Sequence, residues 1–517
     1  YGLRGEYVLV ATGSVFKSLE LVAPVNYYPK LWELVLIPVS GLHDTSVIEG
    51  LSIAMLALTA LACLEILKPI VPGSRTRLLL VALVVTVPAI ANSALSPKPD
   101  LFLAWVLLLA CIEAAAFARE GRASAFAWMI VGFALAFASK LSAPPYIVAI
   151  FAALVGFWWR NGRPRGIDAA SERRFAIVIA AAAIVVAGFV TARTWLLAGV
   201  PLIGPEPLLR FFAKFGLTLK PPVGLLLGGP PLDWRDLPAL VVDQLFRPQV
   251  LGHMVISWIG NVWLYLFALA LAAKLLARRR ADETRARVAP VFVVVLLTGL
   301  ALLLFYRNPE RGGDGNYFVL PIAISIAVGG HAARKSLPDG MPSRLLLATL
   351  PLFVVFQAAY SFISAGWASG TRTFDFDLTR SVRDLRRDDA RIFKADGIAY
   401  IADYLRAVPG TARAVGYVED RAAFRLAATF ETLNFYEYWR QEPLQSADAF
   451  LAYLADHGID YLVMPREGHD PFKRELAPAV LEAERKLRAM PDVKLVEDRD
   501  YVLYDLAALH ASRRAAR

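Results

Sequence analysis

Two charged residues, Asp100 and Lys140, stand where long apolar segments begin and end. Asp100 opens one segment directly after Lys98 and Pro99, and Lys140 closes the next one. An ionisable group near membrane depth is costly, so such a residue marks a pathway or a binding site by default. The Asp100 carboxylate could orient an acceptor or hold a divalent cation, and the Lys140 ammonium suits the phosphate of a lipid.

Each of these two residues also has an ordinary structural explanation. An aspartate after a proline commonly caps a helix, because its carboxylate accepts hydrogen bonds from the first-turn amides. A lysine at the end of a span can extend its ammonium group to the membrane interface. The residues alone leave both explanations open beside the functional one.

Further candidates lie in other polar connections. Glu6 is an acid near the start of the chain that could act as a general base, although an ordinary surface glutamate is the alternative. Arg307 and Arg311 stand beside the flexible stretch Gly312–Gly315 and could hold phosphate oxygens bidentately, with a solvated loop as the alternative. The ionisable residues that we place on one side of the membrane are Glu6, Lys30, Glu33, Asp44, Lys98, Asp100, Lys140, Arg193, Arg307, Glu310, Arg311 and Tyr317.

Several other site classes have no sequence support. The six histidines are scattered without the spacing of zinc ligands, and Cys63 and Cys111 both fall inside apolar segments as core residues would. No Ser-His-Asp arrangement, phosphate-binding P-loop or dinucleotide fingerprint is present. We therefore expect no nucleotide cofactor and no metal site built from these residue types.

The elements that must position the candidates are membrane-spanning helices. The 517 residues are 57% hydrophobic and 19% charged, which is typical of a polytopic membrane protein. A spanning helix needs roughly 17 to 25 mostly apolar residues. We expect about ten spans, with one more upstream of Tyr1, at residues 47–68, 77–95, 101–118, 124–138, 143–159, 175–199, 251–277, 288–306, 317–333 and 343–365.

The connections between these spans alternate between arginine-rich and arginine-poor. Short loops rich in Lys and Arg stay cytoplasmic, so the other connections, and the candidate residues in them, are predicted to be exoplasmic. This asymmetry accounts for most of the net charge of +10, and no nucleic-acid partner is expected.

The chain divides into three predicted regions. Residues 1–46 form a first exoplasmic loop with an interfacial helix over 27–39, whose Tyr and Trp side chains are expected at headgroup level. Residues 47–365 form the transmembrane domain, in which the exoplasmic loop 200–250 carries a second interfacial element at 208–215. Residues 366–517 form a soluble exoplasmic α/β domain. Its expected strands and helices cover residues 412–418, 447–457, 461–464, 476–490, 493–497 and 501–504.

The order of four motifs resembles the GT-C superfamily of membrane glycosyltransferases, which includes protein O-mannosyltransferases and the aminoarabinose transferase of lipid A. The motifs are Asn26-Tyr-Tyr-Pro-Lys30, Pro97-Lys-Pro-Asp100, Ala138-Ser-Lys140 and Asn316-Tyr-Phe-Val-Leu-Pro321. The resemblance covers most of residues 20–365.

The resemblance implies sugar transfer, with inversion, from a polyprenyl-phosphate donor to an envelope lipid, glycan or protein at a bacterial inner membrane, with the C-terminal domain in the periplasm. Glu6 and Asp100 are the implied catalytic acids, with a divalent cation left open. Family members commonly place an aspartate after their first helix, where this sequence offers Glu6, and an arginine before the late tyrosine, where it has Asn316. The residues implied or proposed to bind the donor phosphate are Lys30, Lys98, Lys140, Arg307, Arg311 and Tyr317.

Two functions of different class remain open. The first is the glycosyltransferase, embedded in the lipid bilayer with its lipid-linked donor and envelope acceptor. The second is a non-catalytic scaffold that keeps the same fold within a larger membrane complex. A transporter fits less well, because the charged residues gather at one interface and not near the middle of the bilayer.

Overall fold

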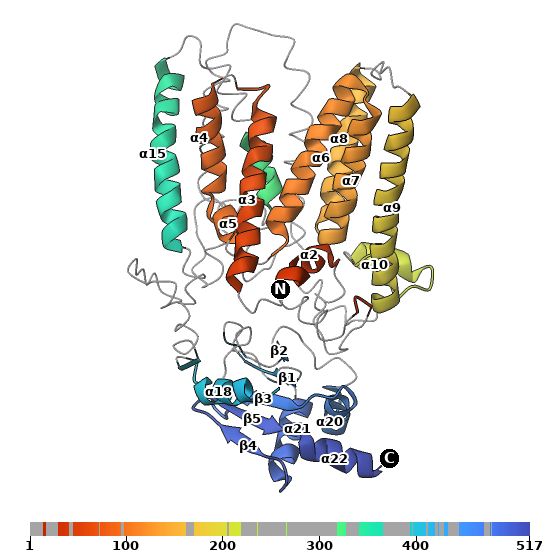
Figure 1. Ribbon diagram of the computed structural model, residues 1–517, viewed down its shortest axis with the longest axis vertical. Helices are drawn as coiled ribbons and strands as arrows, with labels where there is room; N and C mark the ends of the chain where they lie inside the picture. Colours follow the sequence, from red (N-terminus) through yellow and green to blue (C-terminus); the bar gives the residue numbers. More distant parts are fainter. Residues whose placement is uncertain are drawn as a thin grey trace.

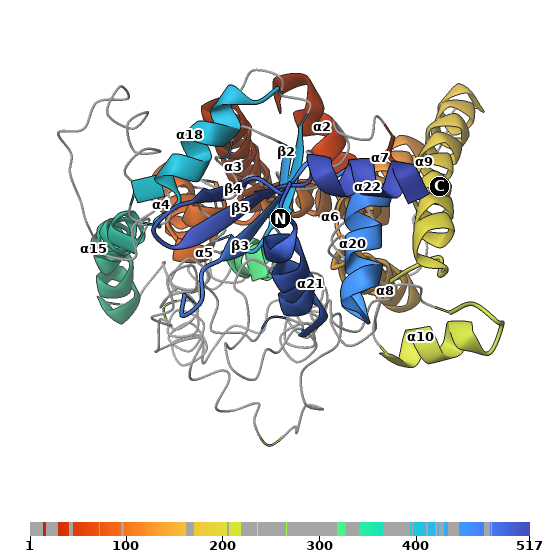
Figure 2. The same ribbon diagram turned by 90° about the horizontal axis from the view of Figure 1, so that it is seen from below.

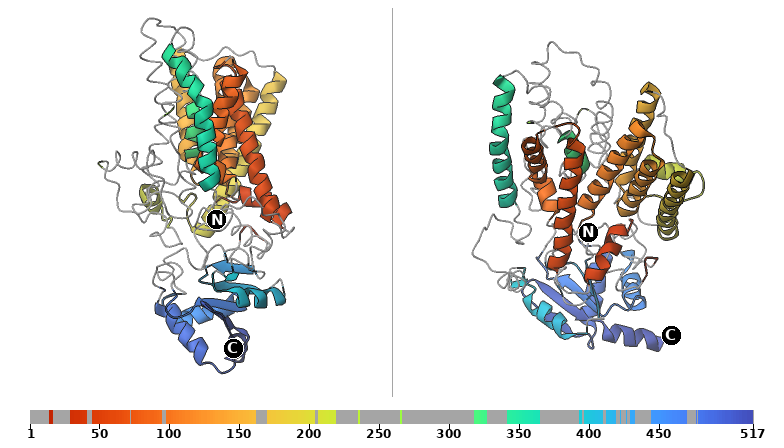
Figure 3. Two further views of the ribbon diagram at one scale, coloured as in Figure 1. Left: turned by 90° about the vertical axis from the view of Figure 1, so that its left-hand side faces the viewer. Right: turned by 45° about the horizontal axis from the view of Figure 1, so that its top comes forward.

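The computed structural model shows a bundle of helices and, beyond one end of it, a small α/β domain (Figure 1). The two views in Figure 3 also show the α/β domain beyond the same end of the bundle. The residues that the structure describes are 14–16, 29–40, 45–71, 73–94, 98–161, 170–203, 206–218, 235, 265, 318–326, 341–364, 393–394, 396–409, 412–418, 422, 426, 429–432, 444–469, 476 and 478–516.

The bundle is built from apolar helices that run up and down. Residues 50–67, 100–120 and 172–198 are helical, long and apolar enough to cross a membrane, and shorter apolar helices cover 123–139, 143–159 and 348–359. The helices of this part are α2 (Leu31–Ser40), α3 (Thr45–Leu67), α4 (Ser74–Val85), α5 (Pro88–Ser93), α6 (Asp100–Glu120), α7 (Ala123–Ser139), α8 (Ala143–Asn161), α9 (Ala170–Ala198), α10 (Glu206–Ala213) and α15 (Met341–Ser364).

Most of the expected spans that fall on described residues coincide with one helix each. These are the spans 47–68, 101–118, 124–138, 143–159, 175–199 and 343–365. Of the expected span 317–333, residues 318–326 are described and are mostly helical, whereas 251–277 and 288–306 lie almost wholly outside the described residues.

The expected span 77–95 is not one helix. Helix α4 ends at Val85, and α5 begins at Pro88, whose ring nitrogen has no proton to continue the ladder. Two carbonyls near the break receive donors from α15: Gln357 Nε2 donates to Leu83 O at 2.7 Å, and Ser361 Oγ donates to Thr86 O at 2.5 Å. Apolar surroundings tolerate a broken helix where other groups satisfy its backbone in this way.

Helices α6 and α7 form a closely packed antiparallel pair. Gly121, at φ 71°, takes the left-handed conformation that ends α6, and its N–H donates to Phe117 O at 2.9 Å. Halfway along α7, a Cβ atom on Gly132 would lie 2.9 Å from Ala110 Cβ and 3.0 Å from Val106 O. The absence of a side chain at Gly132 therefore allows the two helices to approach each other.

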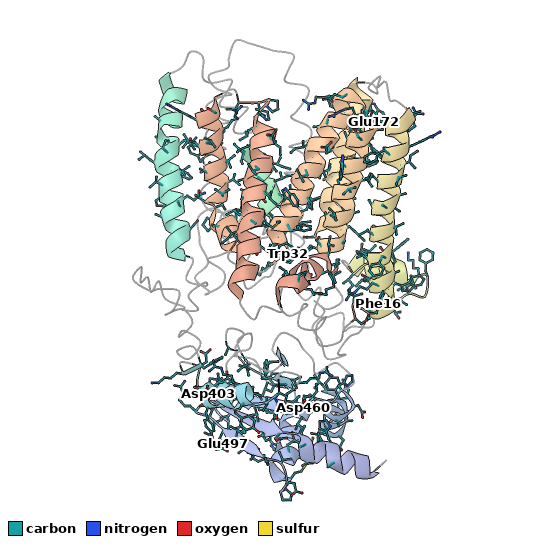
Figure 4. The ribbon with its side chains drawn as sticks, viewed as in Figure 1. Phe16, Trp32, Glu172, Asp403, Asp460 and Glu497 are labelled. Atoms are coloured by element: carbon teal, nitrogen blue, oxygen red, sulfur yellow. The ribbon has the colours of Figure 1, made fainter. Side chains whose placement is uncertain are left out.

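One end of the bundle holds the start of α6 and the end of α7, and we call it the domain-side end because it faces the α/β domain (Figure 1). Trp32 in α2 lies at this end, whereas Glu172 near the start of α9 lies at the opposite end (Figure 4). The arginine-rich connection 119–122, between α6 and α7, is also at the opposite end. This arrangement agrees with the alternation of loops expected from the sequence.

Helix α2 lies across the domain-side end and is packed into the bundle. Trp32 and Leu36 are fully buried in the core of the helical part, and the Trp32 ring lies 5.4 Å from that of Phe102 in α6. Of the expected helix at 27–39, residues 31–39 are helical as part of α2, and Trp32 is buried against the protein. The position of this helix at headgroup level stays a prediction. The Trp32 ring fills the space beside the first turn of α6.

A second short helix, α10, follows α9 at the same end. Its Leu209 packs with Ala198 and Ile203, while Phe211 and Phe215 are exposed. The sequence places the amphipathic run at 208–215, and the helix spans Glu206–Ala213. An interfacial position of this helix stays a prediction.

The α/β domain contains a mixed sheet with the strand order β2-β1-β3-β5-β4. Strand β1 pairs in parallel with β2 and β3, and β5 pairs antiparallel with β3 and β4. The elements are α18 (Ala399–Ala407), β1 (Arg413–Gly416), β2 (Thr429–Thr432), α20 (Ala447–Asp456), β3 (Tyr461–Pro465), α21 (Pro478–Ala489), β4 (Leu495–Glu497), β5 (Tyr501–Asp505) and α22 (Ala507–Ala516).

Alternating side chains of the strands cover the two faces of this sheet. Leu462 and Tyr504 face the core that includes α20 and α21, while Val463 and Leu503 face the core that includes α18. Figure 2 shows these helices on opposite sides of the strands. Each strand and helix expected here is found, and the structure adds α18, β2 and α22, which the sequence pattern did not predict.

Replacing Gly132 tests the close approach of α6 and α7. We expect Gly132→Leu to lower the melting temperature of the purified protein, because overpacking of a tight contact costs about 1–3 kcal/mol or more. Gly156→Leu is the matched control, since nothing lies within 4 Å of a Cβ at that position in α8. Equal melting temperatures for the two variants would contradict this account.

Candidate functional site

Asp100 and Lys140 form an ion pair at the domain-side end. Asp100 is the first residue of α6, and Lys140 directly follows α7. The Lys140 Nζ donates a hydrogen bond to Asp100 Oδ1. Because α6 and α7 are antiparallel, the start of α6 lies beside the end of α7. Asp100 and Lys140 therefore meet although 40 positions separate them in the chain. The sequence selected both residues without predicting that they pair.

The environment of this pair argues against both ordinary explanations, a helix cap and a lysine that extends to the interface, and shows a buried ion pair instead. The Asp100 side chain is only 2% exposed and that of Lys140 18%. Pro99 occupies the cap position of α6, and no side-chain capping hydrogen bond is formed there. Asp100 is therefore not a cap, and Lys140 directs its ammonium to a buried carboxylate.

The burial has an energetic consequence. Removing a charge from water is expensive, and a buried pair is stable only when both partners are present. Asp100 Oδ2, however, has no hydrogen-bond partner among the described residues. The pair thus keeps one open acceptor atom, which could receive a hydroxyl group.

A second buried ion pair lies in and beside α2. Lys30 Nζ donates to Glu33 Oε1 at 3.1 Å, and both side chains are almost fully buried. Trp32 stands between them in sequence and contacts Phe102, two residues after Asp100. Lys30 was expected to bind phosphate, and here its ammonium group binds a carboxylate. The three-residue spacing of a helical Lys and Glu was a signal that could have found this pair.

Arg193 joins α9 to the first segment of the chain. Its Nε donates to Val15 O at 2.6 Å, and the side chain is buried. The rings of Phe16 and Phe189 meet edge to face, 5.6 Å apart. The described part of the first segment is therefore held beside the charged residues of the domain-side end.

The remaining expected site residues are placed only in part. Lys98 is half-buried and lies two positions before Asp100. Glu6, Arg307, Arg311 and Tyr317 lie outside the described residues, and their assignments stay predictions.

The described residues do not suit a metal ion at Asp100. No group of three or more His, Cys, Asp or Glu side chains that could hold one is found in the described part of the chain. The Asp100 oxygen that is engaged already binds an ammonium group, which would repel a divalent cation. The open Asp100 oxygen is better matched to a hydrogen-bond donor.

A comparison of the sequence with known protein families and with curated proteins finds no match. The functional assignment therefore depends on the residues and contacts of this chain.

A double-mutant cycle tests the Asp100–Lys140 pair. We expect Lys140→Met to lower the stability by about 3 kcal/mol, because it leaves a buried carboxylate uncompensated. Asp100→Asn should cost less, since Lys140 is the more exposed partner. The double variant should be more stable than Lys140→Met. Thermal unfolding of the four proteins in one detergent measures this, and strictly additive effects would show that the two side chains do not interact.

Proposed function

We propose that the protein is an integral membrane glycosyltransferase, which moves a sugar from a polyprenyl-phosphate donor to an envelope lipid, glycan or protein. The observation that carries the proposal is the buried Asp100–Lys140 pair at the end of the bundle that faces the α/β domain. The apolar helices suit a lipid-linked donor, and a lysine at the end of a helix suits its phosphate.

The pair suggests how donor and acceptor are coordinated. A donor phosphate is a stronger partner for the Lys140 ammonium than a single carboxylate, because it presents more charge and more acceptor oxygens. When Lys140 turns to the phosphate, the Asp100 carboxylate is released and orients the acceptor hydroxyl group. Binding of the donor thereby prepares the group that positions the second substrate.

The transfer step follows from these roles. The acceptor oxygen attacks the anomeric carbon and forms the new glycosidic bond, while the bond from that carbon to the phosphate oxygen breaks. The acceptor proton passes to a carboxylate, for which Glu6 and Asp100 are the candidates, and polyprenyl phosphate leaves. Lys140 stabilises the charge on the leaving phosphate, together with Lys98, Arg307, Arg311 and Tyr317, whereas Lys30 remains paired with Glu33. The anomeric configuration is inverted.

The orientation in the membrane is part of the proposal. Arginine-rich connections at the far end of the bundle favour a cytoplasmic position there, so the domain-side end and the α/β domain are exoplasmic, in the periplasm of a bacterial inner membrane. The α/β domain is then placed to contact an envelope acceptor.

A second candidate is a non-catalytic scaffold subunit of a membrane complex. In both described ion pairs at the domain-side end, a lysine binds a carboxylate of the same chain. A purely structural role would also require such pairs. A stoichiometric partner that co-purifies with the protein, together with an absence of any donor binding, would favour this reading.

Donor binding and transfer provide the test. The full chain is reconstituted in lipid nanodiscs with a panel of radiolabelled polyprenyl-phosphate sugars and an envelope fraction as acceptor. We expect Lys140→Ala to weaken donor binding about tenfold, since a charge-assisted contact is lost. Asp100→Asn should reduce the transfer rate about 100-fold with less effect on donor binding.

Lys68→Ala is the matched control for these variants. Lys68 also pairs with a carboxylate, that of Glu65, but both are exposed and lie at the opposite end of the bundle. It should leave binding and transfer unchanged. If the wild-type protein neither binds nor transfers any sugar of the panel, the glycosyltransferase proposal is wrong.

A further inference from the structure

Three buried polar atoms at the domain-side end have no hydrogen-bond partner among the described residues. They are Glu33 Oε2, Asp100 Oδ2 and Ser142 Oγ. The three residues are 5%, 3% and 1% exposed. Leaving such an atom unsatisfied costs about 1–3 kcal/mol, and the great majority of buried polar groups do have partners. Three such atoms at one end of the bundle therefore require an explanation.

The three atoms belong to elements that are packed together. Ser142 lies in the turn between α7 and α8, two positions after Lys140, which binds Asp100. The turn is closed by a hydrogen bond from Ala143 N–H to Lys140 O at 3.1 Å. Glu33 follows Trp32, whose ring contacts Phe102 in the first turn of α6. Helix α2, the start of α6 and the α7–α8 turn thus form one neighbourhood.

The charges of this neighbourhood narrow the chemistry of a ligand. Among the described residues it contains four cations, Lys30, Lys98, Lys140 and Arg193, and two carboxylates, Glu33 and Asp100. The excess of positive charge disfavours a cationic ligand. Two of the three open atoms are carboxylate oxygens, which repel an anion and accept hydrogen bonds. What satisfies them is a set of neutral hydrogen-bond donors, and the hydroxyl groups of a sugar supply several such donors on one ligand.

We propose that Glu33, Ser142 and Asp100 together bind the hydroxyl groups of a sugar. The inference rests on the proposed glycosyltransferase function and adds Glu33 and Ser142 as residues that determine which sugar is accepted. The hydroxyl groups could come from the donor sugar or from a glycan acceptor, which present the same chemistry. Polyprenyl phosphate without a sugar should not use this site.

Ser142→Ala separates a binding role from a structural one. If the Ser142 hydroxyl has no partner in the ligand-free protein, its removal should leave the melting temperature unchanged or raise it. Ser139→Ala is the matched control, because Ser139 Oγ, at the end of α7, donates to Leu135 O at 2.5 Å. A fall in the ligand-free melting temperature for Ser142→Ala, as large as that for Ser139→Ala, would overturn the proposal.

Binding to the full chain in nanodiscs then uses three probes: polyprenyl phosphate, the polyprenyl-phosphate sugars, and free mono- and disaccharides. We expect Ser142→Ala to weaken binding of the sugar-bearing probes about three- to tenfold and to leave polyprenyl phosphate unaffected. An effect confined to the lipid-linked sugars identifies the donor as the source, and an effect on free saccharides identifies the acceptor. Both outcomes support the site.

Glu33→Gln provides an independent variant. Its amide oxygen can still accept from Lys30, while the charged Oε2 acceptor is replaced by a donor. We expect about tenfold weaker binding of the sugar-bearing probes, as for loss of a hydrogen bond to a charged group. Unchanged affinities for both Glu33→Gln and Ser142→Ala would refute the site.

The outcomes also separate this inference from the proposed function. If the wild-type protein binds polyprenyl phosphate and no sugar increases the affinity, the sugar site is wrong and the lipid-phosphate donor is supported. If it binds free saccharides but not polyprenyl phosphate, the sugar site is supported and the lipid-phosphate donor is wrong. If no probe binds the wild-type protein, both are wrong.

Discussion

The ion pair between Asp100 and Lys140 is the interaction on which the arrangement of the bundle depends. A buried carboxylate needs its partner, so the end of α7 must meet the start of α6 in one register. Gly132 allows the helix axes to approach closely enough, and Gly121 turns the chain at the far end. The close packing of α6 against α7 and the ion pair at their ends therefore specify the same alignment of the two helices.

A related constraint acts on the backbone at the α4–α5 break. An unpaired carbonyl in apolar surroundings is costly, and the break near Pro88 exposes such groups. Gln357 and Ser361 of α15 donate hydrogen bonds to Leu83 O and Thr86 O. A helix more than 250 positions away in sequence thus satisfies two carbonyl groups near the break. Helix α15 is also the last described helix before the α/β domain. Its position is thus set by backbone chemistry in addition to apolar packing.

The parts that the sequence predicted are those encoded locally. Apolar length locates the helices around α3, α6 and α9, and alternation locates β3 and β5, because each signal lies within the element itself. The break before Pro88 and the burial of Trp32 were missed, since both depend on partners distant in the chain. Likewise, charge and position marked Asp100 and Lys140 one by one, whereas their pairing arises from the antiparallel register of two helices. That Glu33 Oε2 is buried without a hydrogen-bond partner among the described residues can be seen only in the structure, because it depends on which atoms surround it.

The contact between Arg193 and Val15 has a consequence for sequence drift. The guanidinium binds a main-chain carbonyl, which every amino acid supplies, so the side chain at position 15 is free to change without loss of this bond. Substitutions at position 15 are therefore expected to keep this bond, whereas replacement of Arg193 removes it.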